Sequence, residues 1–235
     1  LEPLQRYESP ARLLVAAWLG TTRLIDNLSM EQPMDTNEVM QEFKAAEAML
    51  TGHFILSSGL HSSTYLQCAR ALMDAKRADR LCKALADKVR DWMKTSGQTI
   101  DVIVSPAMGG VVVGYEMGRQ LNLLSMFCER VDGSFQLRRG FALNPGQKVL
   151  VVEDVVTTGK SSMEAVACIK ALGAEAIAVA SLIDRRSQND VTLSLPLISL
   201  LSLDIPTYAP DAIPESLKSM PAVKPGSRFL AQKAS

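Results

Sequence analysis

The chain has 235 residues, with 25 basic and 25 acidic side chains, so its formal net charge at neutral pH is zero. Apolar residues make up 47% of the sequence and aromatic residues only 5%, so a sizeable core must consist mainly of aliphatic side chains. The balanced charge disfavours nucleic acid or an anionic membrane as the main partner. No apolar run is long enough for a membrane span. These bounds favour a single α/β domain with an appendage.

The four cysteines have no C-x-x-C spacing, and three of them lie in apolar segments. This pattern is typical of reduced core thiols in a cytoplasmic protein. With two histidines in the whole chain, a histidine-based metal centre is also disfavoured. The four residues are Cys68, Cys82, Cys128 and Cys168.

Residues 1–34 differ from the remainder of the chain, and we interpret them as a leader or extension of doubtful status. The apolar stretch from Pro10 to Leu19 predicts a short helix. A secretory signal is disfavoured because acidic residues precede this stretch. Met30 and Met34 are plausible starts, so an added leader and a native extension both stay open. Residues 35–235 are expected to form one domain.

The segment from residue 35 to about residue 70 predicts a helix followed by a strand, a turn and a second strand. Asp35 and Glu38 have the spacing of a capping box at a helix start. Two short strand-like runs then flank a serine-rich turn that contains Ser58 and Gly59. This unit is interpreted either as a surface hairpin or as a small hood over a ligand. His61 is interpreted as a solvated loop residue rather than a catalyst.

From residue 78 onward, helical and strand patterns alternate at least four times. Apolar residues at helical spacing between Ala78 and Trp92 indicate a long amphipathic helix. A last apolar run, 195–203, is expected to be an edge strand or a strand that starts late, because Pro196 lacks an amide hydrogen. The alternation predicts an α/β fold with a parallel twisted sheet flanked by helices, and the tail from Asp204 is expected to pack as extended chain beside the hood. Buried strands are indicated at residues 102–104, 123–128, 149–152 and 176–183.

Chemically informative residues follow the predicted strand ends, where ligands bind in parallel sheets. Gly109 and Gly110 follow one strand and would let the backbone approach a ligand at a helix N-terminus. Residues 131–145 include Arg138 and Arg139 and show little apolar periodicity. We interpret this segment as a solvated hairpin or, beside a pyrophosphate site, as a mobile basic lid.

The stretch from Gln147 to Ser162, QKVLVVEDVVTTGKSS, combines a buried strand, an acid pair and a phosphate-binding turn. The carboxylates of Glu153 and Asp154 can accept hydrogen bonds from the neighbouring hydroxyls of a ribose. The Thr-Thr-Gly-Lys-Ser turn then leads into a helix and offers backbone N–H groups, hydroxyls and the helix dipole to a phosphate. Neither the Walker A pattern nor the dinucleotide fingerprint is present. The combination predicts a ribose-5-phosphate site.

This stretch resembles the phosphoribosyl pyrophosphate (PRPP) motif of type I phosphoribosyltransferases, which transfer ribose-5-phosphate from PRPP to a nitrogenous base. Further blocks, in matching order, resemble the orotate phosphoribosyltransferase family over about residues 35–228. These blocks are Phe54-x-Leu56-x-Ser58-Gly59-x-x-Ser62-x-x-Tyr65, Pro106-Ala107-x-Gly109-Gly110, Glu129-Arg130 with Arg138-Arg139-Gly140-Phe141, and Asp184-Arg185 with Val223-Lys224-Pro225-Gly226-Ser227-Arg228.

The resemblance implies a type I phosphoribosyltransferase fold with a small N-terminal hood, and it implies a role for individual residues. Orotate binding is implied for Ser58, Gly59, Thr157 and Arg185, with the arginine pairing with the orotate carboxylate, and Tyr65 belongs to the hood. Asp154 and Arg138 are implied as catalytic residues, and we assign Arg138 to neutralise the pyrophosphate. PRPP binding is implied for Arg130, Glu153, Asp154, Val155, Val156, Thr157, Thr158, Gly159, Lys160 and Ser161.

The same resemblance implies formation of orotidine 5′-monophosphate and pyrophosphate in de novo pyrimidine (UMP) biosynthesis. It implies Mg²⁺ that arrives with PRPP, near Glu153 and Asp154 but without direct protein ligands. It also implies a homodimer in which loop 131–140 is shared across the subunits. One branch of the family has lysine at the positions of Ser57 and Gly109, whereas the Pro-Ala-x-Gly-Gly block resembles another branch.

Two other functions stay open. A purine or uracil phosphoribosyltransferase is disfavoured by the hood signature around Ser58 and by Arg185. A PRPP-sensing regulator without catalytic activity would need a nucleic-acid-binding module. The leader is short for that role, and its only basic side chains are Arg6, Arg12 and Arg23.

Overall fold

A computed structural model describes residues 11–30, 33–56, 58–186 and 193–225. The chain divides into two compact units, Leu1–Asp35 and Thr36–Ser235, and each is described by itself. The predictions for residues 1–10, for Ser57 and for the block at 226–228 lie outside the described residues.

The first unit contains a β-hairpin, so the helix predicted from Pro10 to Leu19 is wrong. Strand β1 (Ala11–Leu19) pairs antiparallel with β2 (Thr22–Met30). The connection is a two-residue turn at Gly20 and Thr21, and Gly20 has a φ of +61°, a conformation that favours glycine. An apolar run of this length can form a helix or a strand, and here it forms a strand because it pairs with the following segment.

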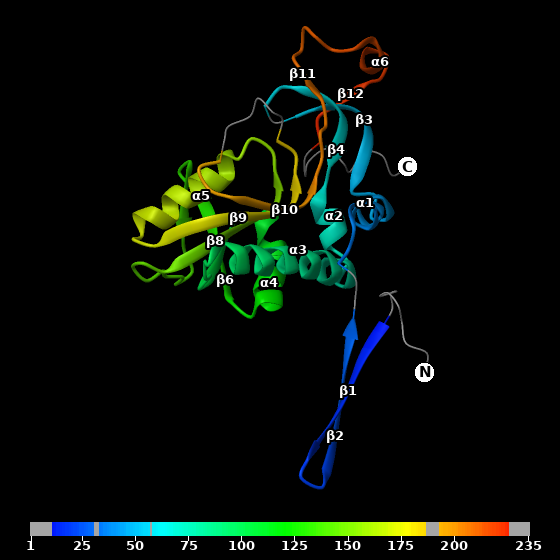
Figure 1. The fold of residues 1–235 in the computed structure, drawn as a ribbon. Coiled ribbons are helices and arrows are strands. Elements are labelled where there is room, and N and C mark those ends of the chain that lie inside the picture. The colour runs from blue at the N-terminus through cyan, green and yellow to red at the C-terminus, as the bar shows by residue number, and fades with distance from the viewer. Residues whose placement is uncertain (1–10, 31–32, 57, 187–192, 226–235) are drawn as a thin grey trace. The chain divides into compact units, whose positions relative to one another are not determined.

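The second unit is built on a six-stranded sheet with the order β10-β9-β8-β5-β6-β7 (Figure 1). Its first five strands are parallel, and β7 pairs antiparallel with β6. The predicted parallel sheet is confirmed, and Pro196 stands just before the edge strand as expected. The strands are β5 (Val102–Pro106), β6 (Leu124–Val131), β7 (Ser134–Leu137), β8 (Lys148–Val156), β9 (Glu175–Asp184) and β10 (Leu197–Ser202).

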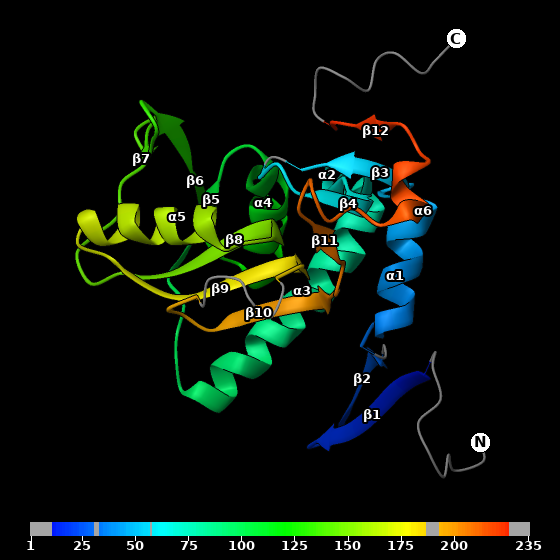
Figure 2. The ribbon, with the colours of Figure 1, turned by 90° about the horizontal axis from the view of Figure 1, so that it is seen from above.

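Helices cover both faces of this sheet, as Figures 1 and 2 show. On one face, Val149 and Val151 of β8 share a buried core with side chains of α5 (Lys160–Ala171). Because side chains alternate along a strand, Leu150 and Val152 turn to the other face, where α3 (Ala75–Ser96) and α4 (Gly109–Leu121) pack. The sequence of β8 is therefore apolar throughout because both of its faces are buried.

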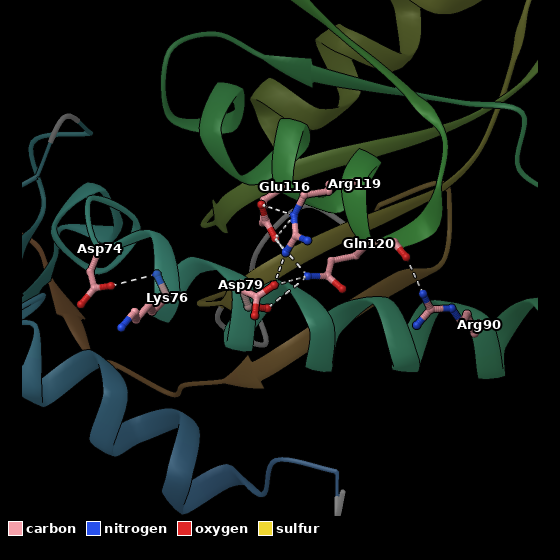
Figure 3. A network of polar contacts seen from close by, with 7 residues as sticks. All are labelled: Asp74, Lys76, Asp79, Arg90, Glu116, Arg119 and Gln120. Carbon is pink, nitrogen blue, oxygen red and sulfur yellow. Dashed lines mark hydrogen bonds and ion pairs between the residues drawn. The ribbon is translucent and has the colours of Figure 1, made fainter. Parts of the chain in front are cut away.

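A polar network joins the exposed sides of α3 and α4 (Figure 3). Arg119 of α4 forms ion pairs with Asp79 of α3 and, at 2.6 Å, with Glu116 one turn earlier. The Gln120 amide donates to the Asp79 carboxylate over 2.8 Å. Arg90 of α3 donates to the backbone carbonyl of Gln120. These bonds hold the two helices together beneath the sheet.

The hood is a second sheet with the order β11-β4-β3-β12. The central pair is antiparallel, which confirms the predicted strand, turn and strand. The tail after residue 204 does pack against this unit, but it also contains a short helix and adds one strand to each side of the hairpin. The hood elements are α1 (Thr36–Ala45), β3 (Met49–Ile55), β4 (His61–Leu66), α2 (Cys68–Leu72), β11 (Thr207–Tyr208), α6 (Glu215–Lys218) and β12 (Ala222–Val223).

The basic segment after β6 forms a hairpin, one of the two interpretations of residues 131–145. Strand β6 continues to Val131, and the chain turns at Asp132 and Gly133, which both have positive φ. Strand β7 then pairs back along β6 and buries Phe135. In the described part of the chain, no helix is long and apolar enough to cross a membrane.

Candidate active site

The ends of strands β5, β8 and β9 bring three of the predicted stretches together at one edge of the sheet. The Arg185 amide donates to the Val156 carbonyl over 2.8 Å, which joins the stretch after β9 to the end of β8. Gly109, after β5, lies so close to the acid pair that a Cβ atom on it would stand 2.8 Å from a carboxylate oxygen of Asp154. The structure thus assembles one site from three segments that are distant in the sequence.

Glu153 lies on the α5 side of β8 and is 7% exposed. Its carboxylate accepts a 2.9 Å hydrogen bond from the hydroxyl of Ser162 in the first turns of α5. Burial raises the pKa of Glu153 to about 7, since the lowering effect of the Ser162 hydroxyl is smaller, and the nearby charge of Asp154 raises it further. Near neutral pH this carboxyl can therefore hold or release a proton.

Asp154 points to the opposite side of the strand, toward α4 and the hood. Its Oδ1 accepts a hydrogen bond of 2.9 Å from the backbone N–H of Val155. Burial raises the pKa of Asp154, and the hydrogen bond from Val155 lowers it by less. Tyr65 of the hood lies near Asp154. Its pKa is raised mainly by burial, and the charges of Cys68 and Asp154 raise it further. The two acids of the pair thus serve different sides of the strand end.

The turn after β8 leaves the N-terminus of α5 open. Thr157, Thr158 and Lys160 are exposed, whereas Gly159 is buried and has a φ of +77°. A Cβ atom on Gly159 would stand 2.6 Å from Leu193, so the close packing also requires glycine. The N-cap residue is Gly159, which has no side chain, and no acidic residue lies in the first turn of the helix. Among the N–H groups at this end, that of Lys160 donates to the Thr158 hydroxyl over 3.3 Å. Backbone N–H groups and the helix dipole are therefore available to an anion.

Arg185 reaches from the end of β9 into the hood. Its guanidinium donates to the hydroxyl of Ser62 over 2.9 Å, and burial lowers its pKa. Ser62 is fully buried, and its hydroxyl also lies 3.0 Å from the Thr64 carbonyl and 3.3 Å from the Pro206 carbonyl. The sequence reasoning gave Ser62 no role, although this residue belongs to the hood signature.

The predicted hood residues Ser58 and Gly59 lie on the turn between β3 and β4. The Leu56 amide donates to the Leu60 carbonyl over 2.8 Å, and the Gly59 amide donates to the Leu56 carbonyl over 2.9 Å. Gly59 has a φ of +85°, which explains the glycine in this turn. Both Ser58 and Gly59 are exposed, so the turn presents them to solvent.

The predicted arginines of the β6–β7 hairpin differ in their contacts. Arg130 forms an ion pair with Glu164 of α5, and its guanidinium lies 4.4 Å from the centre of the Phe135 ring. Arg139 pairs with Glu129 at 2.7 Å. Arg138 is exposed, and no ion pair of this residue occurs among the residues that the structure describes. Arg138 is thus the arginine of this hairpin that is available to a phosphate.

Glu153 and Asp154 are the residues to compare with the way in which proteins hold Mg²⁺. Within residues 11–30, 33–56, 58–186 and 193–225, no group of three or more His, Cys, Asp or Glu side chains could hold a metal ion. Glu153 and Asp154 are the two adjacent carboxylates at the strand end. Mg²⁺ commonly binds one or two carboxylates together with substrate phosphates, so these residues fit that mode.

The fold and the site define a phosphoribosyltransferase, and residues 70–199 match the family described as the phosphoribosyl transferase domain. The chain is 56% identical over 195 residues to the orotate phosphoribosyltransferase of Rhizorhabdus wittichii, a match that covers 83% of this chain and 97% of that protein. It is 52% identical over 198 residues to the orotate phosphoribosyltransferase of Sphingopyxis alaskensis, covering 84% and 100%. The chain belongs to the orotate phosphoribosyltransferase family.

Solved structures agree on the fold. The crystal structure of orotate phosphoribosyltransferase from Aeropyrum pernix is similar with a TM-score of 0.54 and 22% identity, covering 70% of this chain and 93% of that chain. The orotate phosphoribosyltransferase of Mycobacterium tuberculosis H37Rv, solved with inorganic phosphate, has a TM-score of 0.52 and 21% identity, covering 70% and 95%. The predicted type I phosphoribosyltransferase fold is confirmed.

Proposed function

We propose that this protein transfers ribose-5-phosphate from PRPP to orotate, giving orotidine 5′-monophosphate and pyrophosphate in de novo pyrimidine (UMP) biosynthesis. The position of Arg185 carries the proposal, together with the names of the relatives. Arg185 lies between the end of β8 and the hood. Its amide donates a hydrogen bond to the Val156 carbonyl, and its guanidinium donates one to the Ser62 hydroxyl. A forked guanidinium suits the carboxylate of orotate, which purine bases and uracil lack.

PRPP binding is supported by the open N-terminus of α5. The 5-phosphate would receive hydrogen bonds from the turn 157–161, where the N-cap residue is a glycine and no acidic side chain lies in the first turn of the helix. Asp154 would accept hydrogen bonds from the ribose hydroxyls on the hood side, and Glu153 would support the ring from the α5 side. Thr157, exposed at the start of the turn, would lie next to both the phosphate and the base.

The reaction would proceed by separation of charge between the ribose and the leaving group. The bond between the ribose C1 and the pyrophosphate oxygen breaks, and the pyrophosphate takes the electron pair. A ring nitrogen of orotate gives its electron pair to C1 and releases its N–H proton to solvent. Arg138 would neutralise charge on the departing pyrophosphate, because it is exposed and unpaired among the described residues. Mg²⁺ bound with PRPP, near Glu153 and Asp154, would supply further neutralisation of the pyrophosphate oxygens.

We also infer a homodimer, in which the segment 131–140 closes over the site of the neighbouring subunit. An apolar stripe at the start of α4 supports it: Met108 is 83%, Val112 49% and Tyr115 70% exposed. These residues share one helix face, and a second copy of the chain would bury them. A Tyr115→Glu substitution is expected to give monomers in sedimentation velocity runs. A dimer with an unchanged dissociation constant would show that this surface is not the interface.

A cytoplasmic location is the last part of the proposal. It is supported by the four cysteines, which are all free thiols, with three of them buried. Such residues persist as thiols in a reducing compartment.

PRPP-dependent loss of orotate absorbance, followed with purified protein and Mg²⁺, tests the proposed reaction. Turnover of orotate that is largely lost in an Asp154→Asn variant would support both the substrate and the site. A folded protein that binds PRPP but consumes neither orotate nor another base would instead favour the regulator.

A further inference from the structure

The two histidines of the chain contact each other in the hood, which the sequence did not indicate. Nε2 of His53 lies 2.6 Å from Nδ1 of His61, and the ring centres are 4.9 Å apart. Nδ1 of His53 lies 3.1 Å from the backbone carbonyl oxygen of Met220. His53 is 6% exposed and His61 is half-buried in β4, so the interpretation of His61 as a solvated loop residue is wrong.

The Met220 carbonyl sets the direction of this chain of hydrogen bonds for a neutral His53 ring. The Met220 carbonyl can only accept, so Nδ1 of His53 carries the hydrogen and donates it. In a neutral His53 ring, Nε2 is then the acceptor, and Nδ1–H of His61 donates to it. The chain therefore runs from His61 through His53 to the backbone of the tail.

This chain of bonds lies at the base of the turn that carries Ser58 and Gly59. His61 is the first residue of β4 and pairs with Ile55, the last residue of β3. The next residue, Ser62, accepts the hydrogen bond from Arg185. The turn, the histidine pair and the partner of Arg185 are thus consecutive features of one short segment.

The histidine pair also ties in the tail. His53 pairs with Ala222 of β12, two residues after Met220. His61 pairs with Tyr208 of β11. The two residues that carry the rings therefore each pair with one tail strand, on opposite sides of the central hairpin.

We propose that His53 and His61 are positioning residues for the base. They hold the turn at Ser58 and Gly59 and the start of β4 in register with the tail. They thereby keep the Ser62 hydroxyl within hydrogen-bond distance of the Arg185 guanidinium. This inference rests on the proposed function, because Arg185 is taken as the residue that recognises the orotate carboxylate. It assigns the pair to base binding and not to PRPP, whose turn follows β8 in the other sheet.

Variants of His61 separate this role from a merely structural one. His61→Ala removes the donor, and we expect the KM for orotate to rise about three- to tenfold, the effect of one hydrogen bond, while the KM for PRPP stays unchanged. His61→Asn retains an N–H near the position of Nδ1 and is expected to restore the KM for orotate to within about twofold of the original value. Equal KM values in all three proteins would overturn the proposal, as would equal rises for both substrates.

Variants of His53 divide the chain of bonds into its two halves and cover the case in which His61→Ala does not fold. His53→Asn can still donate to Met220 but cannot reach His61, so it should reproduce the rise in the KM for orotate. His53→Gln can still accept from His61 but loses Met220, so its main effect should be on the tail. Identical behaviour of the two variants would contradict a directed chain.

Hydrogen exchange without substrates keeps this inference distinct from the proposed reaction. The amides of Leu56 and Gly59, which close the turn, should exchange faster in His61→Ala and His53→Asn than in the original protein or His61→Asn. If the protein does not consume orotate but shows this exchange pattern, the proposed function fails and the positioning pair stands. If orotate is consumed but the exchange rates and both KM values do not change, the pair has no positioning role.

Discussion

Replacement of Glu153 by glutamine should stabilise the protein and at the same time weaken catalysis. Glu153 is buried, and its pKa is raised from an ordinary 4.5 to about 7. Between these two pH values the folded protein holds a proton that the unfolded chain has released. The free energy of unfolding therefore falls as the pH rises through this window. Above about pH 7 the folded protein bears the full destabilisation that comes from ionising the buried carboxyl.

The size of the effect follows from the two pKa values. They differ by about 2.5 pH units, and at about 1.4 kcal/mol per unit the ionised carboxylate costs the folded state about 3 kcal/mol. Glutamine carries no charge, and its side-chain oxygen can still accept the hydrogen bond from Ser162. At about pH 8 the Glu153→Gln variant should therefore be more stable by about 3 kcal/mol, and at about pH 5 by less than about 1 kcal/mol.

Urea unfolding between about pH 5 and pH 8, without substrates, measures this difference. Glu175→Gln is the matched control, because Glu175 is exposed at the start of β9 and its neutralisation should leave the pH dependence unchanged. In activity assays the Glu153→Gln variant should show a higher KM for PRPP, because the ribose loses a carboxylate. A stability gain that does not depend on pH, or a loss of stability at about pH 8, would contradict the claim that ionised Glu153 destabilises the folded state.

Four further predictions concern the reacting groups. Asp154→Asn should lower kcat/KM by about 100-fold, because the neutral amide stabilises a cationic ribose poorly; unchanged progress curves would exclude Asp154 from the site. Arg138→Ala should lower kcat by about 100-fold while Arg139→Ala, which removes an arginine already paired with Glu129, has a smaller effect; the reverse order in steady-state assays would assign the pyrophosphate to Arg139. If the segment 131–140 serves the partner's site, mixing the Asp154→Asn and Arg138→Ala proteins should restore part of the activity, and no recovery after subunit exchange would contradict sharing. Arg185→Lys should raise the KM for orotate about tenfold, because lysine keeps the charge but loses the fork, and an unchanged KM would remove Arg185 from base recognition.

Most of the central sheet could be predicted from local patterns. The β-branched run of β8 and the alternation with helices indicate a parallel sheet, and the strand ends then locate the acid pair and the turn before α5. The prediction of a helix at Pro10 to Leu19 is wrong because strand pairing with β2, a contact outside the segment, decides its structure. Strand β7 has four residues, which is too short for a periodic signal.

Contacts between distant segments could not be predicted in this way. Ser62 and Arg185 are separated by 123 positions, and His53 and Met220 by 167. The ion pair between Arg130 and Glu164 likewise depends on how β6 packs against α5. Only the packed fold brings these groups together, so the sequence indicated the type of site but not how the hood is held over it.

The most direct test of base selection by Arg185 compares orotate with uracil, which is the same ring without the carboxylate. We expect kcat/KM with PRPP to be at least about 1000-fold higher for orotate, because uracil leaves the half-buried guanidinium of Arg185 without a carboxylate partner. Arg185→Lys should narrow this ratio by lowering kcat/KM for orotate alone. Similar kcat/KM values for the two bases would contradict the claim that Arg185 selects orotate.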